Sequence, residues 1–231
     1  MRQVILDTET TGLRTEDGHR IIEIGCLEMI DRKLTGKHYH QFINPKREIE
    51  SGAVAIHGIT NAFLSDKPIF DDIAGELMDF ISGSELIIHN APFDLAFLNY
   101  ELSLLRKDWS TVTDYCGVID TLQLARKMHA GQRNNLDALC KRYAVDNSKR
   151  DVHGALVDAH LLAQVYLAMT GGQGNFFDSI NESQTRVSNH TQTPVSIPVE
   201  KHDLIVLKAN PDELLEHKKY VEELKSESQW D

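Results

Sequence analysis

The sequence predicts an α/β fold in which three antiparallel strands are followed by alternating helices and strands. Residues 21–30 (IIEIGCLEMI) are β-branched and partly alternating, which is typical of a strand. Several later segments repeat apolar residues at the spacing of an amphipathic helix. The 231 residues suffice for one substantial domain with an appendage.

The expected elements follow in chain order. Residues 3–6, 21–30 and 39–43 are extended segments, and we expect them to pair as consecutive antiparallel strands. The pattern then changes to helix, strand and helix, which indicates an α/β sandwich. The later expected elements are helices over 71–81, 92–105, 120–128 and 134–143, a buried strand over 85–89, and a helix after His153 that ends at residues 170–172.

Composition excludes several classes of protein. Apolar residues make up 41% and charged residues 26%, which argues against a fibrous or wholly disordered chain. No apolar run approaches the roughly 18–20 residues that cross a bilayer. The cysteines Cys26, Cys116 and Cys140 lack the spacing of a zinc site or disulfide framework. We therefore expect a cytoplasmic protein.

The net charge of −11 bears on any role with nucleic acid. Proteins that bind nucleic acid unaided usually present a basic surface to the phosphates. An acidic chain that acts on DNA is therefore expected to hold it weakly, with metal ions or a partner protein supplying the remaining attraction.

The chain beyond residue 172 divides in two. Residues 173–199 are rich in Ser, Thr, Asn and Gln, which predicts a flexible linker. Beyond them lie a strand candidate at 204–207 and a capped helix candidate from 211 to about 224. Their apolar residues are too few for a core, so we expect a partner to cover them. The expected domains are 1–172, 173–199 and 200–231.

The first motif with candidate chemistry follows the opening apolar run. Asp7 and Glu9 are two residues apart, so both carboxylates lie on one face of a strand. Like charges this close are destabilising unless a cation neutralises them, and hard divalent cations prefer oxygen ligands. A metal site is one interpretation, and a solvated strand end is the other.

The second motif places Asp94 in the first turn of the expected helix over 92–105, directly after a buried strand. A carboxylate at this position also complements the helix dipole, so the acid alone does not require a metal. Asn90 is a candidate N-cap for the same helix.

The third motif, HGALVD, opens the last helix with His153 and Asp158. Asp158 lies one turn from Ala155 and Leu162, so we expect its side chain to point toward the sheet. A carboxylate there needs a cation or a hydrogen-bond partner. His153 lies just outside the regular helix, where its imidazole can reach a water molecule; a capping histidine is the alternative.

In order and context, the DxE motif, the aspartate of HNAPFD and the HxxxxD motif resemble those of the DEDDh 3′→5′ exonucleases. The segments IIEIG, RNNLDALC, DNSKR and HGALVDA are similar to the epsilon proofreading family of bacterial DNA polymerase III, over residues 1–173. This resemblance implies a ribonuclease H-like fold with two divalent cations, Mg²⁺ or Mn²⁺. It also implies stepwise removal of nucleotides from the 3′ end of single-stranded or frayed DNA.

The same resemblance implies roles for individual residues. Metal ligation falls to Asp7, Glu9, Asp94 and Asp158, and His153 becomes the general base. The residues implied in substrate contact are Asp7, Thr8, Glu9, His57 and Asp158. The chemistry agrees, because four acids can supply a pair of cations with ligands and a histidine titrating near neutrality can deprotonate water.

One substrate contact of the epsilon family does not carry over. The family places an acid five residues before the histidine of its VHGI-like segment, and His57 in IHGI matches that histidine. Gly52 occupies the position of the acid. Glu48 or Glu50 could substitute for it, or the contact is lost.

The resemblance also implies partners. In the family the C-terminal segment binds the alpha (polymerase) subunit, which suits the uncovered apolar residues here: Leu204, Leu214, Val221, Leu224 and Trp230. Gln173, Phe176 and Phe177 are similar to a sliding-clamp-binding peptide, and a chance combination is the alternative. Tethering to a polymerase would take the place of intrinsic affinity for DNA.

The leading hypothesis is a proofreading exonuclease that releases nucleoside monophosphates from the primer 3′ end. An RNA-trimming enzyme of the same superfamily uses the same five residues and is the nearest rival. A catalytically silent scaffold between polymerase and clamp would show the loss of an acid, and none of the four is lost. A Rossmann-type nucleotide-binding domain needs a GxGxxG turn after the first strand, which the sequence lacks.

Overall fold

The computed structural model describes residues 1–105, 108–148 and 152–171, together with Leu215, His217 and Lys218, which are helical and exposed. Every predicted catalytic residue falls within these ranges. None of the described helices is long and apolar enough to cross a membrane. The predicted linker, the strand and most of the helix of the C-terminal segment lie outside the described residues, as do Gln173, Phe176, Phe177, Leu204, Leu214, Val221, Leu224 and Trp230.

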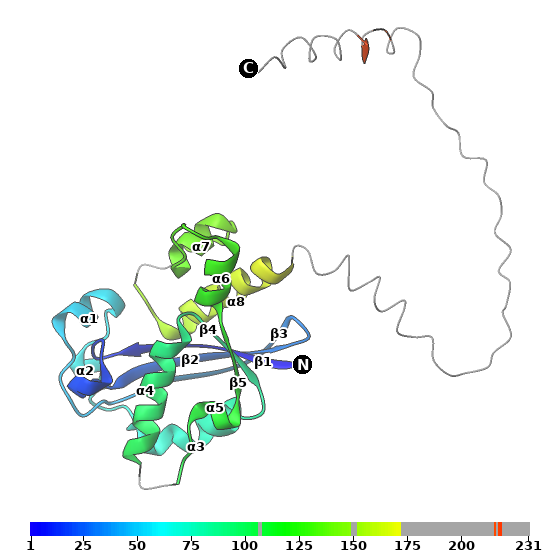
Figure 1. Cartoon of the computed structure of the whole chain (residues 1–231). Helices are drawn as coiled ribbons and strands as arrows, with labels where there is room; N and C mark the ends of the chain where they lie inside the picture. Colours follow the sequence, from blue (N-terminus) through cyan, green and yellow to red (C-terminus); the bar gives the residue numbers. More distant parts are fainter. Residues whose placement is uncertain (106–107, 149–151, 172–214, 216, 219–231) are drawn as a thin grey trace, which may run out of the picture. The chain divides into compact units, whose positions relative to one another are not determined.

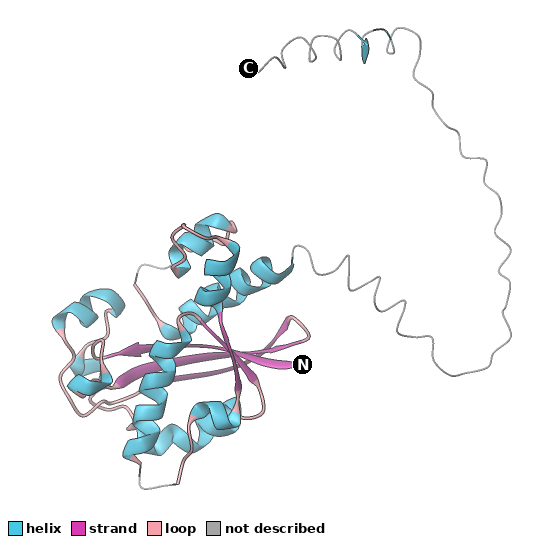
Figure 2. Cartoon of the chain, viewed as in Figure 1, coloured by secondary structure: helices cyan, strands magenta, loops and turns pink. Residues whose placement is uncertain are grey.

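A mixed five-stranded sheet lies at the centre of the domain, in the order β3-β2-β1-β4-β5 (Figure 2). The strands are β1 (Arg2–Thr10), β2 (Ile21–Ile30), β3 (Lys33–Phe42), β4 (Glu85–Ile88) and β5 (Gly117–Asp120). The first three pair antiparallel as predicted, whereas β4 and β5 run parallel to β1. The α/β fold with three leading antiparallel strands is therefore confirmed.

Helices cover both faces of this sheet (Figure 1). The helices α3, α4 and α5 pack on one face, α6, α7 and α8 pack on the other, and α1 and α2 lie beside the start of β2 and the end of β3. Their bounds are α1 Ser51–His57, α2 Asn61–Leu64, α3 Phe70–Ile81, α4 Ala91–Leu104, α5 Val112–Tyr115, α6 Thr121–Met128, α7 Leu136–Arg142 and α8 Ala155–Gly171, and a 3₁₀ turn occupies Thr15–Asp17.

Strand alternation in β1 divides the core into two layers. Val4 and Leu6 pack with α3 and α4, whereas Ile5 packs with α7 and α8. Since side chains alternate along a strand, the two later odd positions, Asp7 and Glu9, project toward the α8 side. The acids of the first motif therefore emerge beneath the helix that carries the third motif.

A buried ion pair fixes α4, which carries the second motif, against the sheet. Glu101 is buried, and its Oε1 accepts hydrogen bonds from Arg20 Nε at 2.8 Å and from the backbone N–H of Ile21 at 3.1 Å. Because Ile21 begins β2, this carboxylate joins α4 directly to the strand next to β1.

Four short elements were not predicted: α1, α2, α5 and β5. Each has between four and seven residues, too few for a periodic pattern to identify it. The third strand begins at Lys33, so the prediction of residues 39–43 covered only its second half. Asn90 does occupy the N-cap position of α4, but its backbone is left-handed (φ 69°) and its side chain makes no capping hydrogen bond.

Candidate active site

The five predicted catalytic residues line one pocket of about 260 Å³ at the C-terminal ends of the parallel strands β1 and β4. Ligands of open α/β sheets bind at this edge because loops and helix starts converge there. The lining residues are Asp7, Thr8, Glu9, His89, Phe93, Asp94, Asn135, Leu136, Asp137, His153 and Asp158. The three motifs, which are spread over about 150 residues of sequence, thus come together in one pocket.

The start of α8 supplies one wall of the pocket. Asp158 lies in the first turn of the helix and is only 3% exposed, so it points inward as predicted. Its carboxylate Oδ2 lies 3.2 Å from Nδ1 of His153, whose side chain is 44% exposed. The backbone N–H of His153 donates to the carbonyl of Ile56 at 3.1 Å. His153 therefore lies between the buried acid and solvent, and its backbone is held against α1.

A second wall comes from α4, where Asp94 is almost completely buried. The hydroxyl of Thr8 donates to Asp94 Oδ1 at 2.7 Å, so the residue between the two β1 acids positions the acid of the second motif. Burial raises the pKa of Asp94 to about 7, and the hydrogen bond from Thr8 opposes that increase. Asp94 is thus an acid at which a nearby cation would strongly favour the ionised form.

The donor set fits a hard divalent cation. Among the described residues, ligand atoms of Glu9, His153 and Asp158 all lie within 4.8 Å of one another. Asp7 and Asp94 line the same pocket outside that group. The set is rich in carboxylate oxygen and contains no thiolate, which suits Mg²⁺ or Mn²⁺ better than soft metals.

His57, the predicted substrate contact, lines a neighbouring cavity of about 290 Å³ rather than the pocket that holds the acids. The two cavities share Thr8, Glu9 and Phe93. His57 Nδ1 accepts a hydrogen bond from the backbone N–H of Ile59 at 3.0 Å, which leaves the proton on Nε2. Burial lowers the pKa of His57, so the imidazole is a neutral donor at neutral pH.

The two candidate replacements for the missing acid differ in position. Glu50 lines the cavity of His57 together with Gly52, and its Oε1 lies 3.1 Å from His19 Nε2. Glu48 does not line that cavity, and its carboxylate accepts a hydrogen bond from Asn61 at 3.1 Å. Glu50 is therefore the acid placed to contact a ligand there.

Sequence reasoning missed several pocket residues. His89 follows the end of β4, and its Nδ1 lies 3.0 Å from the hydroxyl of Thr121. Asn135 and Asp137 occupy the N-cap and the first turn of α7. The sequence contained a pattern that could have identified them, because His89 lies at the end of an expected strand, and Asn135 and Asp137 lie at the start of an expected helix. The prediction treated both segments as structural.

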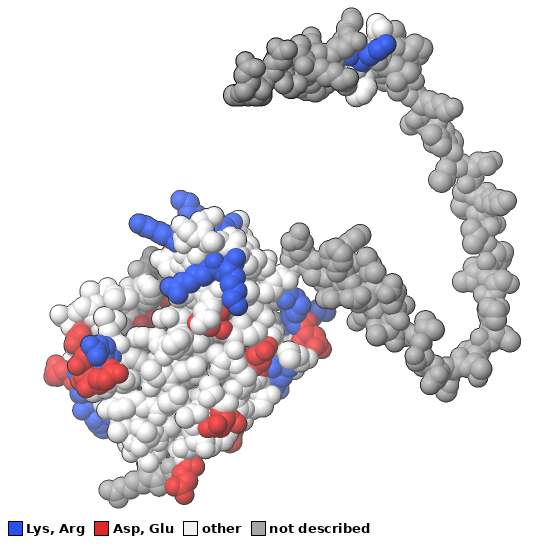
Figure 3. Space-filling model, viewed as in Figure 1, with Lys and Arg blue, Asp and Glu red and all other residues white. Residues whose placement is uncertain are grey.

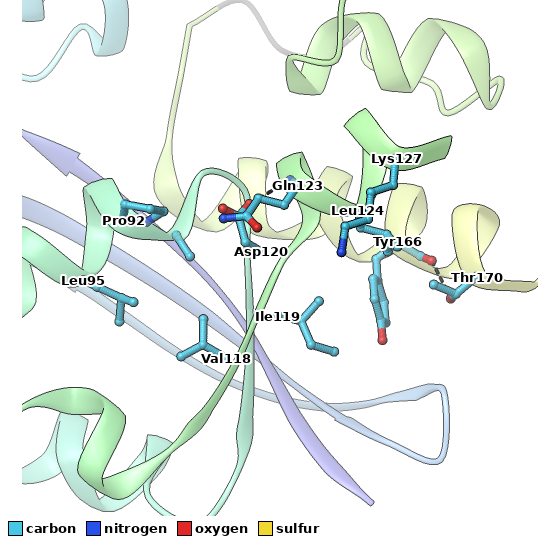
Figure 4. Close-up of a pocket in the computed structure, with 11 residues that line it drawn as sticks. Pro92, Leu95, Val118, Ile119, Asp120, Gln123, Leu124, Lys127, Tyr166 and Thr170 are labelled. Atoms are coloured by element: carbon cyan, nitrogen blue, oxygen red, sulfur yellow. Dashed lines mark hydrogen bonds between the residues drawn. The ribbon is translucent and has the colours of Figure 1, made fainter. Parts of the chain in front are cut away.

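The largest of the three described cavities, about 540 Å³, lies elsewhere and contains none of the five catalytic candidates (Figure 4). Val118 and Ile119 of the edge strand β5 form its floor, between Leu95 of α4 and Tyr166 of α8. Lys127 of α6 lies at its rim. Its lining resembles an open groove along a sheet edge more than a catalytic centre.

The chain is similar to known exonucleases in sequence and in fold. Residues 4–166 match the family described as exonuclease. DNA polymerase III subunit epsilon of Rickettsia typhi is 49% identical over 224 residues, which cover 97% of each chain. The Escherichia coli K12 protein of the same name is 47% identical over 94% of this chain and 90% of its own. A solved structure of exonuclease X in complex with 5′ overhanging duplex DNA aligns with a TM-score of 0.60 and 27% identity, covering 74% of this chain and 93% of that one.

Proposed function

The chain belongs to the exonuclease family and, within it, to the DNA polymerase III epsilon subunits, and we propose how its residues carry out proofreading. It is a 3′→5′ exonuclease that releases nucleoside monophosphates from the primer 3′ end as a subunit of a replicative DNA polymerase. The observation that carries the assignment of its site is the convergence of Asp7, Glu9, Asp94, His153 and Asp158 in one pocket.

The carboxylates of Asp7, Glu9, Asp94 and Asp158 would hold two divalent cations, Mg²⁺ or Mn²⁺. Bound cations of this kind supply Lewis acidity, which stabilises negative charge on phosphate oxygens and makes water easier to deprotonate. The acids line the pocket from more than one side, since Asp158 comes from α8 and Asp94 from α4. Thr8 keeps Asp94 oriented.

His153 is the general base. With Nδ1–H directed at Asp158 Oδ2, the neutral ring accepts a proton at Nε2. The side chain is partly exposed, so water reaches it. Asp158 thus has two roles, as a metal ligand and as the group that sets the tautomer of the base, which resembles the orienting carboxylate of a catalytic triad.

The two adjoining cavities bind different parts of the substrate. The cavity that contains His57 and Glu50 receives the terminal nucleotide, and the pocket of the acids receives the phosphate to be cut. Thr8 and Glu9 contact both parts because they line both cavities. A neutral His57 donates a hydrogen bond from Nε2 without adding a charge that would compete with the cations.

The proposal also covers the segments of the chain and the partners that they bind. Residues 1–172 form the nuclease domain, 173–199 a linker, and 200–231 the segment that binds the alpha subunit, in a bacterial replisome in the cytoplasm. The 47–49% identity to epsilon subunits over nearly the whole chain supports this organisation. Gln173, Phe176 and Phe177 bind the sliding clamp.

Replacing Asp7 by Ala is expected to reduce nucleotide release by roughly 10³-fold, because a lost ligand removes several kcal/mol of charge stabilisation. A 3′-labelled primer assayed with Mg²⁺, with Mn²⁺ and with chelator measures polarity and metal dependence together. The exposed Asp66→Ala is the matched control and should retain full activity. Retained activity in Asp7→Ala would rule out the metal assignment, and faster hydrolysis of short RNA than of mismatched DNA ends would favour the RNA-trimming alternative.

Deleting residues 200–231 is expected to leave nuclease activity unchanged and to abolish co-purification with the alpha subunit, since a tether carries no catalytic group. Gel filtration of the mixed proteins measures the complex. The Phe176→Ala/Phe177→Ala variant serves as the comparison, because it should keep the alpha subunit and lose the clamp. A complex that survives the deletion would show that another surface forms the tether.

A further inference from the structure

Residues 121–148, which contain α6 and α7, are basic within an acidic chain. They hold five Lys and Arg residues but only two acids, Asp137 and Asp146, although the whole chain carries a net charge of −11. Figure 3 shows Lys and Arg side chains gathered over α6 and α7. The α6–α7 surface comprises Arg126, Lys127, Arg133 and Lys141, which are exposed, and Arg142, which is half-buried.

One end of this surface adjoins the active site. Asn135 and Asp137, at the start of α7, line the pocket of the acids, and Arg133 lies two residues before Asn135. Arg142 folds back toward the same end, because its Nη1 donates to Asn134 Oδ1 at 3.0 Å and its Nη2 to the Arg133 carbonyl at 2.9 Å. The side chain of Arg142 and the backbone of Arg133 therefore lie beside the wall of the pocket that α7 forms.

The other end extends along α6. Arg126 and Lys127 occupy its last turn, and Lys127 lies at the rim of the groove along β5 (Figure 4). The surface thus runs from the catalytic pocket toward the outer edge of the sheet. Asp120 caps the first turn of α6, so the positive charge of this helix gathers in its last turn, and both acids of residues 121–148 lie at or beyond the ends of α7.

If the proposed function holds, the part of the DNA strand outside the two cavities needs a surface that binds its phosphates. The helix α1 lines the cavity that contains His57, whereas α7 lines the pocket of the acids and not that cavity. With the terminal nucleotide in the first cavity and the scissile phosphate between the acids, the rest of the strand leaves past α7. Each nucleotide that leaves carries a negative charge.

We propose that the α6–α7 surface binds the phosphates of the DNA strand just upstream of its 3′ end. This inference rests on the proposed function. The negative net charge led us to expect that metal ions or a partner protein supply most of the attraction for DNA. The proposal changes this expectation, because the chain is acidic as a whole but basic on the surface beside the site. Partners then supplement a weak intrinsic grip on the strand.

The test uses the full chain with two substrates. A 20-nucleotide single-stranded DNA reaches the α6–α7 surface, whereas the p-nitrophenyl ester of thymidine 5′-monophosphate occupies only the terminal-nucleotide site. The variant Arg126→Gln/Lys127→Gln/Arg133→Gln/Lys141→Gln should lower kcat/KM for the DNA by about 10-fold or more, mainly through KM. Its salt dependence should weaken by about 0.7 per lost phosphate contact in log–log slope. Hydrolysis of the ester should stay at the wild-type rate.

The matched control is Lys33→Glu/Lys37→Glu, which lowers the net charge by the same four units on β3, at the opposite edge of the sheet. It should leave both substrates unaffected. Equal losses in control and variant would show an effect of net charge and overturn the proposal, as would parallel losses on both substrates. Unchanged DNA kinetics would also overturn it and would favour an acidic protein partner. If wild-type protein cleaves neither substrate, the proposed function fails instead.

Discussion

Replacing Asp94 by Asn is expected to abolish nucleotide release while making the metal-free protein more stable above pH 7. Activity falls because a metal ligand is lost, by roughly 10³-fold on the scale of several kcal/mol that cations contribute. The gain in stability has a separate cause. Asp94 is buried without a cation in the metal-free protein, and ionising it there is costly.

The pH range follows from the sign of the shift. The pKa of Asp94 is raised from its ordinary 3.8 to about 7 in the folded protein, so the folded state keeps a proton that the unfolded state has lost. Stability therefore decreases as pH rises from about 4 to about 7 and is level above that, by up to about 4 kcal/mol in total. Asn cannot ionise, so the stability of the Asp94→Asn variant does not decrease over this pH range.

Thermal unfolding in chelator measures the effect. Asp94→Asn should melt roughly 8–16 °C above wild type at pH 8, and the difference should fall to about a quarter of that near pH 4.5 and vanish below about pH 3.5. Added Mg²⁺ should then raise the melting temperature of wild type more than that of the variant, because binding to the folded state stabilises it. A variant that is less stable than wild type at pH 8 in chelator would show that Asp94 is ionised and well paired without metal.

Asp72→Asn provides the matched control, because Asp72 is also an acid in the first turn of a helix, α3. It is exposed, and its Oδ2 accepts a hydrogen bond from the Ile69 backbone N–H at 3.1 Å. Its replacement should therefore lower stability by about 1 kcal/mol at pH 8 and leave activity unchanged.

The fold could be predicted where local patterns were long. Four of the ten residues of β2 are isoleucine, and its partly alternating pattern gave the correct bounds; α8 was located from its apolar spacing and terminal glycines. The short elements could not be predicted in this way. The helix α1 contains a glycine and has no capping side chain, so tertiary packing decides its conformation. The edge strand β5 pairs only with β4, and its four residues show no alternation.

For the active site, too, only the features that depend on local sequence could be predicted. The alternation of β1 placed Asp7 and Glu9 on one face, and helical spacing turned Asp158 inward, because both are local properties. The hydrogen bond from Thr8 to Asp94 joins residues 86 apart in sequence, and only the packing of α4 against β1 reveals it. The separation of His57 into its own cavity and the placement of Glu50 beside it likewise depend on where α1 folds.

One glycine determines how closely α8 approaches the sheet. Gly25 of β2 pairs with Asp7 of β1, and a Cβ added at Gly25 would overlap backbone atoms of Ala155 and Leu156 in the first turn of α8. Asp158 lies in the same turn, and His153 lies two residues before Ala155. The missing side chain therefore allows the acid and the base of α8 to approach the acids of β1.

Replacing Gly25 by Ala is accordingly expected to lower both stability and activity. Overlap with backbone has no flexible side chain to relieve it, so the helix must move, at a cost of about 3 kcal/mol in the free energy of unfolding. A displacement of about 1 Å at His153 and Asp158 should reduce kcat by roughly 10²-fold. Chemical denaturation and the 3′-labelled primer assay measure the two effects.

Gly75→Ala in the middle of α3 is the matched control, because an added Cβ there meets no atom within 4 Å. This variant should gain about 0.5–1 kcal/mol in stability from the better helix propensity of Ala and keep full activity. If Gly25→Ala behaved like Gly75→Ala, α8 could not lie as close to β2 as the structure places it. A loss of stability with normal activity would mean instead that α8 moves without carrying His153 and Asp158, so that the approach at Gly25 serves packing alone.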